Sequence, residues 1–175
     1  IKIYGIHPSG SRLISGTLDI HQELEKKIAE FKESESALLF TTGTMANIGI
    51  IPALINIPNV STQSIIKEKL SKINAEIFSD ELNHATIIDG CRLAKKTRLT
   101  IYRHSNIDNL EHKLHKSKVK HKIIITDGIF SMDGDIAPLP KILQLAQTYS
   151  ALLMVDDAHA TGVLGKNGRG SVEFF

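Results

Sequence analysis

A short apolar run that ends in acidic residues and a histidine places the strongest constraint on the fold of this chain. The run Leu152-Leu153-Met154-Val155 is too short for a helix, and Asp156, Asp157 and His159 follow it. Such a run predicts a buried strand of a parallel sheet, and ligands of α/β proteins bind at the carboxyl ends of these strands. A carboxylate at the end of a buried strand is costly unless a cation meets it. Because the imidazole of His159 lies only three residues beyond Asp156, both side chains are predicted to face one ligand. The alternative is a strand-capping aspartate followed by a surface loop.

A second run of the same kind lies upstream and completes a strand–helix–strand unit. Ile123-Ile124-Ile125-Thr126-Asp127 predicts a buried strand, and a turn-rich loop that contains Ser131 follows it. A helix expected over 140–149 then leads to a strand over 151–156. The two strands of such a unit are parallel, so the Ser131 loop and the segment after Asp156 are expected at the same edge of the sheet. Ser131 is otherwise explained as an ordinary turn residue.

A glycine-containing turn at residue 43 offers a candidate phosphate site. The apolar segment 37–40 predicts a strand, and Thr41-Thr42-Gly43-Thr44 leads into a helix expected over 45–55. A strand-to-helix turn of this kind exposes backbone N–H groups at a helix N-terminus, where phosphate groups bind. Many α/β turns share the pattern, so the turn alone does not identify a ligand.

Strand and helix patterns alternate along the whole chain, which predicts an α/β domain with a largely parallel sheet and helices on both faces. Helices are expected over 18–32, 45–55, 84–95, 107–117 and 140–149, and strands over 37–41, 75–79, 99–103, 122–127 and 151–156. Residues 59–74 are interpreted as an insertion with the apolar spacing of a short amphipathic helix. Neither an internal repeat nor a linker divides the chain.

The composition indicates an ordinary globular protein and excludes several classes of function. The chain has 175 residues, 42% of them hydrophobic, and a formal net charge of +2, so nucleic-acid binding is not indicated. The lysines between residues 113 and 122 are interpreted as a solvated helix face. No cluster of carboxylates or thiolates accompanies His112 and His115, so no metal site is predicted. The single Cys91 fits a reducing, cytoplasmic compartment, and no membrane-spanning segment is expected.

Several separate motifs resemble the α-oxoamine synthases, which are fold-type-I pyridoxal-phosphate enzymes. These motifs are Gly10-Ser11-Arg12, Ser79-Asp80-Glu81-Leu82-Asn83-His84-Ala85, Ser131-Met132-Asp133-Gly134 and Val155-Asp156-Asp157-Ala158-His159. They occur in the family's order from about residue 10 to residue 170. The resemblance implies the large cofactor-binding domain of that fold, in incomplete form, and pyridoxal 5′-phosphate as the cofactor.

The resemblance assigns roles to the residues that surround the cofactor ring. It implies that Asp156 pairs with the pyridinium nitrogen and keeps it protonated, so that the ring acts as an electron sink. It implies that His159 hydrogen-bonds the phenolic oxygen, with Ser131 nearby, and that His84 stacks on the ring. Without the resemblance, His84 is also explained as a helix-capping or surface residue.

The resemblance also assigns the phosphate site, and the geometry of a strand end separates the two adjacent aspartates. The backbone amides of Gly43 and Thr44 are implied to hold the phosphate, although the family commonly has an aromatic residue where Thr44 stands. Asp157 is expected to point away from the ring, because successive side chains at a strand end point in opposite directions.

The reaction implied by the resemblance joins an amino acid to an acyl-CoA or acyl-carrier thioester and releases carbon dioxide. The segment Asp135-Ile136-Ala137-Pro138-Leu139 is most similar to the family member that uses L-alanine and a pimeloyl thioester in biotin synthesis. The segment Ile87-Ile88-Asp89-Gly90 is equally typical of the member that uses glycine and acetyl-CoA, which stays an alternative. Family members are homodimers, so a homodimer is expected for the full-length enzyme.

The Schiff-base lysine of the family is not expected within these residues. In the family it lies about thirty residues beyond the ring-binding aspartate, whereas 19 residues follow Asp156 here. Lys166, in a glycine-rich loop, is a poor candidate. Residues 1–175 are therefore expected to be a partial cofactor-binding domain that is inactive alone. A non-catalytic partner subunit is the alternative, and the presence of Asp156, His159 and His84 disfavours it.

Overall fold

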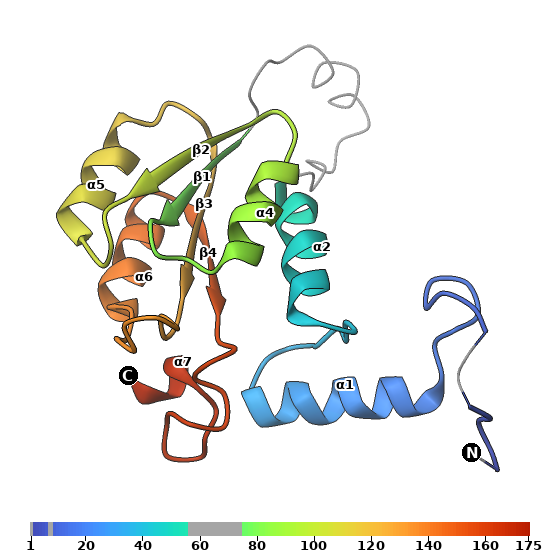
Figure 1. Ribbon diagram of the computed structural model, residues 1–175. Coiled ribbons are helices and arrows are strands. Elements are labelled where there is room, and N and C mark those ends of the chain that lie inside the picture. Colours follow the sequence, from blue (N-terminus) through green and yellow to red (C-terminus); the bar gives the residue numbers. More distant parts are fainter. Residues whose placement is uncertain (1, 7–8, 56–74) are drawn as a thin grey trace. The chain divides into compact units, whose positions relative to one another are not determined.

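The computed structural model describes residues 2–6, 9–55 and 75–175, which form two compact units divided after Thr41 (Figure 1). The insertion predicted over 59–74 lies outside the described residues. No change in composition marks the division after Thr41, so the sequence does not predict it. Among the helices of the described ranges, none has both the length and the apolar character needed to cross a membrane.

The first unit, residues 1–41, is built on helix α1 (Asp19–Lys32). The backbone N–H of Leu18 donates to Nδ1 of His21 at 3.0 Å, which satisfies one donor at the helix start. The helix ends where Glu33 adopts a left-handed backbone conformation with φ 52°. These bounds confirm the helix predicted over 18–32.

The strand predicted over 37–41 is wrong, because side chains satisfy the backbone that a strand neighbour would pair. The N–H of Leu39 donates to Oε1 of Glu25 at 2.7 Å, and the carbonyl of Leu39 accepts from Arg12 at 2.9 Å. Arg12 and Glu25 also form an ion pair at 2.6 Å. With its polar groups paired in this way, the segment needs no sheet, and residues 35–40 have no regular secondary structure.

The second unit, residues 42–175, contains a four-stranded parallel sheet. Its strands are β1 (Ala75–Asp80), β2 (Thr97–Tyr102), β3 (His121–Asp127) and β4 (Ala151–Asp156), in the order β2-β1-β3-β4. The pairing register of β3 with β4 sets Asp127 opposite Asp156. The parallel sheet and the shared edge predicted for the loops after β3 and β4 are confirmed.

Helices cover both faces of this sheet, as predicted (Figure 1). They are α2 (Gly43–Ile55), α4 (Ala85–Leu93), α5 (Ile107–Lys116) and α6 (Leu139–Thr148), with the short α7 (Ser171–Phe174) near the C-terminus. On one face, α2 and α4 pack over Ile77, Ile123 and Ile125; on the other, α5 and α6 pack over Phe78 and Ile124. Continuous apolar strands are expected where a parallel sheet is buried on both sides.

Candidate active site at the carboxyl edge of the sheet

Three neighbouring strands end in an aspartate, and the chain gives each aspartate a different environment. Asp80 ends β1, Asp127 ends β3 and Asp156 ends β4. Parallel strands bring these ends to one edge of the sheet, so three carboxylates collect there. Their partners decide which of them remains available for a ligand.

Asp156 is half-buried and is held by two hydrogen bonds from uncharged donors. Its Oδ1 accepts from the backbone N–H of Ala158 at 3.1 Å, and its Oδ2 accepts from Nδ2 of Asn47 at 2.8 Å. Among residues 2–6, 9–55 and 75–175, no cationic side chain pairs with this carboxylate. The carboxylate of Asp156 is therefore held in position but lacks a cationic partner, which a ligand could supply.

His84 caps helix α4 and presents an exposed imidazole at the same edge. Its backbone N–H donates to Oδ2 of Asp127 at 2.8 Å, which fixes the main chain to the end of β3. Its Nδ1 contacts the hydroxyl of Thr86 at 2.8 Å and accepts from the N–H of Thr86 at 3.3 Å. The capping role weighed from the sequence is confirmed, and Nε2 accepts or donates no hydrogen bond among the described residues.

Buried Asn83 anchors the segment that carries His84. Its Nδ2 donates to the carbonyl of Ile125 at 2.8 Å, and its Oδ1 accepts from the N–H of Asp127 at 2.9 Å. Nδ2 also donates to Oγ of Ser79 at 2.9 Å, so the start of α4 is tied both to β3 and to β1, the strand that precedes it. The position of His84 is therefore set by the sheet and not by the loop alone.

Asp127 is the most perturbed carboxyl group of this edge. Burial, together with the nearby charge of Asp156, raises the pKa of Asp127 to about 6, against the opposing effects of the His84 N–H and the charges of His84 and His159. The side chain is 4% exposed. The charge of Asp156 on the paired strand thus adds to the cost of ionising Asp127.

The N-terminus of α2 presents free backbone amides in the same unit. The hydroxyl of Thr42 accepts from the N–H of Met45 at 3.1 Å and so caps the helix, which begins at Gly43 and not at residue 45 as expected. The amides of Gly43 and Thr44 precede the first intrahelical bond, and both residues are exposed. A Cβ at residue 43 would meet nothing within 4 Å, so the space above this turn is open.

Ser131 and His159 are both exposed, and neither hydrogen-bonds another described residue. Ser131 lies in a loop closed by a bridge between Ile129 and Ile136. His159 is near enough for its charge to favour ionisation of Asp127. The structure thus joins His84 and Asp156 in one network and leaves Ser131 and His159 on the loops of the same edge.

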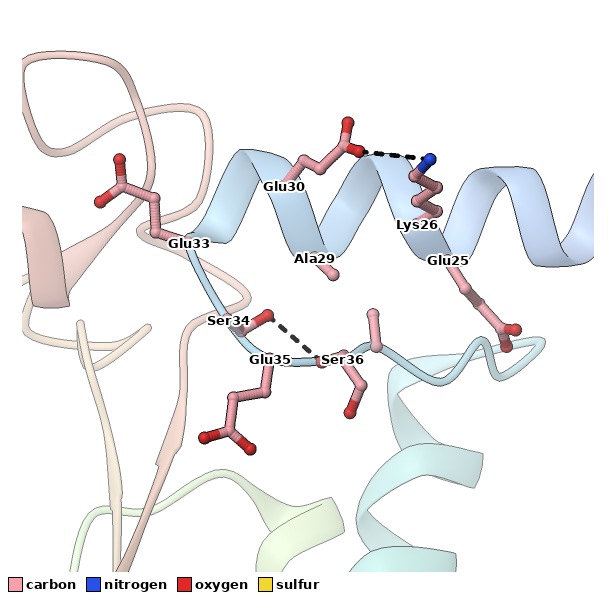
Figure 2. Close-up of a pocket in the computed structure, with 9 residues that line it drawn as sticks. Glu25, Lys26, Ala29, Glu30, Glu33, Ser34, Glu35 and Ser36 are labelled. Atoms are coloured by element: carbon pink, nitrogen blue, oxygen red, sulfur yellow. Dashed lines mark hydrogen bonds and ion pairs between the residues drawn. The ribbon is translucent and has the colours of Figure 1, made fainter.

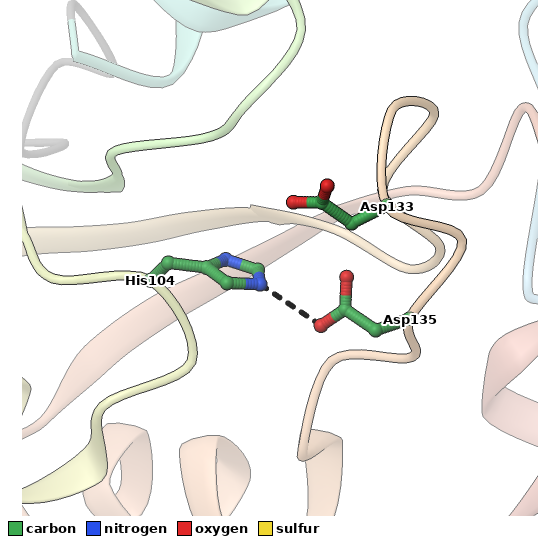
Figure 3. A group of neighbouring side chains, drawn as sticks. All are labelled: His104, Asp133 and Asp135. Carbon is green, nitrogen blue, oxygen red and sulfur yellow. Dashed lines mark hydrogen bonds and ion pairs between the residues drawn. The ribbon is translucent and has the colours of Figure 1, made fainter.

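His104 ties the Ser131 loop to the sheet, as Figure 3 shows. Its Nδ1 contacts Oδ1 of Asp80 at 3.0 Å, and its Nε2 contacts Oδ2 of Asp135 at 2.9 Å. Burial alone would lower the pKa of His104, but the hydrogen bonds and charges of Asp80 and Asp135 raise it overall. Asp80 therefore has a hydrogen-bonded imidazole as its partner, whose protonated form it favours, unlike Asp156. Asp133 completes a group whose donor atoms lie within 4.8 Å of one another.

Asn47, Thr86, Asp127 and His104 were missed as site residues. Asp127 has the same sequence signal as Asp156, because it too is an aspartate at the end of an apolar strand. Asn47 is a single amide in the otherwise apolar helix α2, and Thr86 lies two residues beyond His84. No spacing rule connects positions this far apart along the chain.

A groove on the first unit contains none of the predicted site residues. It lies between the second half of α1 and the segment that follows it, and Figure 2 shows Ala29 at its base and several glutamates around it. Lys26 and Glu30 pair across one helix turn at 3.9 Å. An acidic groove of this kind does not suit a phosphorylated cofactor.

Comparison with known proteins identifies relatives along the whole chain. The family model for aminotransferases of class I and II matches residues 4–173. A curated 8-amino-7-oxononanoate synthase of Lysinibacillus sphaericus is 48% identical over 176 residues, and that of Thermoanaerobacter pseudethanolicus is 49% identical over 177 residues. Each alignment covers 100% of this chain, but only 41% and 40% of these two relatives. The chain thus spans about two fifths of their length.

Two solved structures of related enzymes superpose closely on this chain. Serine palmitoyltransferase from S. paucimobilis with bound PLP–myriocin aldimine matches 99% of this chain and 39% of that chain, with a TM-score of 0.83 and 31% identity. An 8-amino-7-oxononanoate synthase from Francisella tularensis matches 98% of this chain and 42% of that chain, with a TM-score of 0.72 and 31% identity.

Proposed function

Because this chain belongs to the aminotransferase class I and II family, we propose that it is the cofactor-binding part of a pyridoxal-phosphate-dependent acyltransferase. The proposed reaction condenses an amino acid with an acyl thioester and releases carbon dioxide. Relatives named 8-amino-7-oxononanoate synthase agree with the resemblance of Asp135-Ile136-Ala137-Pro138-Leu139, which implies L-alanine and a pimeloyl thioester as the proposed substrates. Serine palmitoyltransferase is also similar, but its lower identity makes it the weaker guide to substrate.

The observation that carries this proposal is the uncompensated carboxylate of Asp156 beside an exposed imidazole and a free helix N-terminus. A protonated pyridine nitrogen would supply the missing cation, and a phosphate would suit the amides of Gly43 and Thr44. Asp80, by contrast, already has His104 as its partner. The residues present therefore fit pyridoxal phosphate.

The chain's own groups prepare the site for chemistry at the carboxyl edge. When bound, pyridoxal phosphate supplies an electron sink for the carbanion formed at the amino acid. Asp156, held by Asn47 and Ala158, would keep the pyridine nitrogen protonated. His84, fixed by its cap and by Asp127, would cover the ring, while His159 and Ser131 would bond its phenolic oxygen.

The first test compares pyridoxal phosphate with pyridoxal as ligands of the purified chain. We expect pyridoxal phosphate to bind reversibly and pyridoxal at least about tenfold more weakly, because it lacks the group that the α2 amides would hold. Inorganic phosphate should compete with the phosphorylated ligand. An absorbance titration in which the two ligands bind equally would contradict the proposed phosphate site, and failure of both to bind would contradict the proposed function.

The second test asks whether any lysine of this chain forms a covalent link with the cofactor. We expect borohydride reduction and peptide mapping to yield no stoichiometric pyridoxyl adduct, since Lys166 lies in an exposed loop. An adduct on Lys166 would overturn this expectation. Sequencing the DNA downstream of the Phe175 codon would show whether a lysine-bearing continuation is encoded.

The assembly and location of the full-length enzyme follow the same proposal. A homodimer in the cytoplasm, acting on a small amino acid and an acyl thioester, accords with the α-oxoamine synthase resemblance. Sedimentation of a protein extended to the length of its relatives would test the dimer.

A further inference from the structure

A buried amide in helix α2 lies at the centre of the site network. Asn47 is 5% exposed and is one turn from the free amides at the start of that helix. A buried amide in an apolar helix is costly unless its polar atoms are paired. Its Nδ2 donates to Oδ2 of Asp156 at 2.8 Å and to Oγ1 of Thr86 at 3.0 Å.

The carboxylate of Asp156 determines which way the Asn47 amide points. An ionised carboxylate only accepts hydrogen bonds, so the nitrogen of the amide, and not its oxygen, must face Asp156. The same nitrogen contacts Thr86, so its second hydrogen goes to the Thr86 hydroxyl oxygen. Both hydrogens of one amide are thereby committed to two residues of the site.

The direction of this bond determines the protonation pattern of His84. Because Oγ1 of Thr86 accepts from Asn47, its own hydrogen is free to be donated to Nδ1 of His84, 2.8 Å away. The backbone N–H of Thr86 also points at Nδ1, at 3.3 Å. A ring nitrogen that accepts from two donors carries no hydrogen, so the proton of the neutral imidazole lies on Nε2.

The close approach of α2 to α4 is what brings these residues within reach. Gly90 of α4 faces Asn47, and a Cβ at residue 90 would lie 2.8 Å from the Asn47 carbonyl oxygen and 2.8 Å from Cδ1 of Ile51. A residue larger than glycine would hold the two helices further apart. Hydrogen bonds of 2.8–3.0 Å between α2, α4 and β4 depend on this spacing.

We propose that Asn47 is a positioning residue that, through Thr86, holds His84 in the tautomer protonated on Nε2 while orienting the carboxylate of Asp156. A simple packing role would not explain why both amide hydrogens go to site residues on two different elements. The tautomer of His84 is a property of the chain without cofactor, so it does not depend on the proposed function. Only the reason why the tautomer would matter, namely cofactor binding, rests on that function.

Nitrogen NMR of the histidine-labelled chain, recorded without cofactor and in dilute solution, tests the proposal directly. The His84 signal is identified by its loss in His84→Gln. We expect Nδ1 of His84 to be unprotonated and Nε2 to carry the hydrogen. Thr86→Val, which removes the hydroxyl at similar volume, and Asn47→Leu, which removes the amide, should each convert this single form into a mixture of tautomers. Thr86→Ser should restore it.

His121 serves as the internal control, because its Nε2 contacts the carbonyl of Leu54 at 2.9 Å, outside this network. Its signals should not change in any variant that folds. Predominance of the Nδ1–H form in the unaltered chain would overturn the proposal. An unchanged tautomer in both Thr86→Val and Asn47→Leu, with His121 unaffected, would do the same. If Asn47→Leu does not fold, the comparison of Thr86→Val with Thr86→Ser decides.

The result is separable from the proposed function. Failure of pyridoxal phosphate to bind would contradict the cofactor assignment and leave the tautomer result intact. A mixed tautomer in the unaltered chain would contradict the role of Asn47 and leave cofactor binding intact.

Discussion

Three aspartates lie at the carboxyl edge of the sheet, and their hydrogen-bond partners decide which of them can pair with a ligand. Asp80 is compensated by His104 at 3.0 Å. Asp127 accepts from the His84 N–H and is buried, which raises its pKa. Asp156 is less buried and has only neutral donors among the described residues, so no cationic side chain of those residues meets its charge. Asp156 thus stays the proposed partner of the pyridine nitrogen.

Asp156 and Asp157 are adjacent, but they are expected to respond differently to loss of charge. In a full-length enzyme, Asp156→Asn keeps the shape but removes the charge that would hold the pyridine nitrogen protonated. We expect turnover to fall about a hundredfold or more, roughly 3 kcal/mol of transition-state stabilisation, with a smaller loss of cofactor affinity. Steady-state kinetics and cofactor dissociation constants measure the two effects.

Asp157→Asn is the matched control, because the Asp157 carboxylate faces the C-terminal segment. It accepts from the N–H of Ser171 at 3.1 Å and also binds the hydroxyls of Ser171 and Thr161. These bonds hold Asp157 in the fold, so its replacement should reduce stability more than turnover. If Asp157→Asn is the variant that abolishes activity, the ring partner has been assigned to the wrong aspartate.

The raised pKa of Asp127 predicts that the folded chain loses stability as the pH rises. Its pKa is about 6 in the folded chain against 3.8 for an ordinary aspartate, so between these values the folded state holds a proton that the unfolded state has released. Stability should fall over this window by on the order of 2–3 kcal/mol and should stay lower above it. Urea unfolding at a series of pH values measures the change.

Asp127→Asn should remove this loss, because an amide does not ionise and its oxygen can still accept from the His84 N–H. The variant is expected to be more stable than the unaltered chain at pH 8 and similar to it near pH 4. His104, whose pKa is raised, adds its own loss of stability as the pH rises through that pKa, but this loss is common to both proteins. Parallel pH profiles for the two would show that Asp127 does not titrate as inferred.

At the scale of helices and strands, most elements could be predicted because their apolar patterns are long or end in clear turn signals. The strand over 151–156 was predicted at its observed bounds, and the helix over 107–117 lacks only its last residue in the structure. The segment 37–41 failed because the side chains of Glu25 and Arg12 replace a strand partner. The apolar character of a short segment cannot show that side chains will bond its backbone. The side chains that bond Leu39 come from residues at least 14 positions away.

The crossing of α2 and α4 depends on Gly90, and Gly90→Ala is expected to disturb it. The added methyl group would lie 2.8 Å from the Asn47 carbonyl oxygen, so the helices must move apart. Overpacking of this kind costs about 1–3 kcal/mol, which outweighs the helix-propensity gain of alanine over glycine. We also expect weaker binding of pyridoxal phosphate, because the Asn47 contacts to Asp156 and Thr86 would lengthen.

Asp89→Ala provides the comparison on the same helix. Asp89 is exposed and pairs with Arg92 at 3.2 Å, so its loss should change the free energy of unfolding by no more than about 0.5 kcal/mol. Chemical denaturation and the cofactor titration, performed on both variants, measure the predicted contrast. Equal stability of Gly90→Ala and the unaltered chain would mean that the helices adapt to the methyl group without cost.

For the whole molecule, the site predicted from sequence falls within the second unit, residues 42–175. Asp156, His159, Ser131, His84, Gly43 and Thr44 could be chosen because each lies in a motif next to a predicted element boundary. Asn47 and Thr86 could not, since their importance arises from the packing of α2 on α4. The division of the chain after Thr41 was equally hidden, because a boundary between compact units needs no change in composition.

The second unit also exposes an apolar groove, from which we expect concentration-dependent self-association of the isolated chain. The groove lies beside the edge strand β4 and is lined by Leu139, Pro140, Leu143, Leu153, Val155, Val172 and Phe175. Leu143, Val172 and Phe175 are 47%, 71% and 59% exposed. Exposed apolar patches and unpaired strand edges favour association between copies. Sedimentation velocity over a concentration series should therefore show growing oligomers.

Replacing Leu143 and Val172 with lysine should suppress these oligomers, because both side chains are exposed and the introduced charges resist burial. Circular dichroism should show that the double variant keeps its secondary structure. A paired Leu82→Lys and Met132→Lys variant, which changes exposed apolar residues outside the groove, should still associate. If the unaltered chain sediments as a single monomer at every concentration, the groove does not drive association. If both double variants are equally free of oligomers, general surface hydrophobicity, and not this groove, causes the self-association.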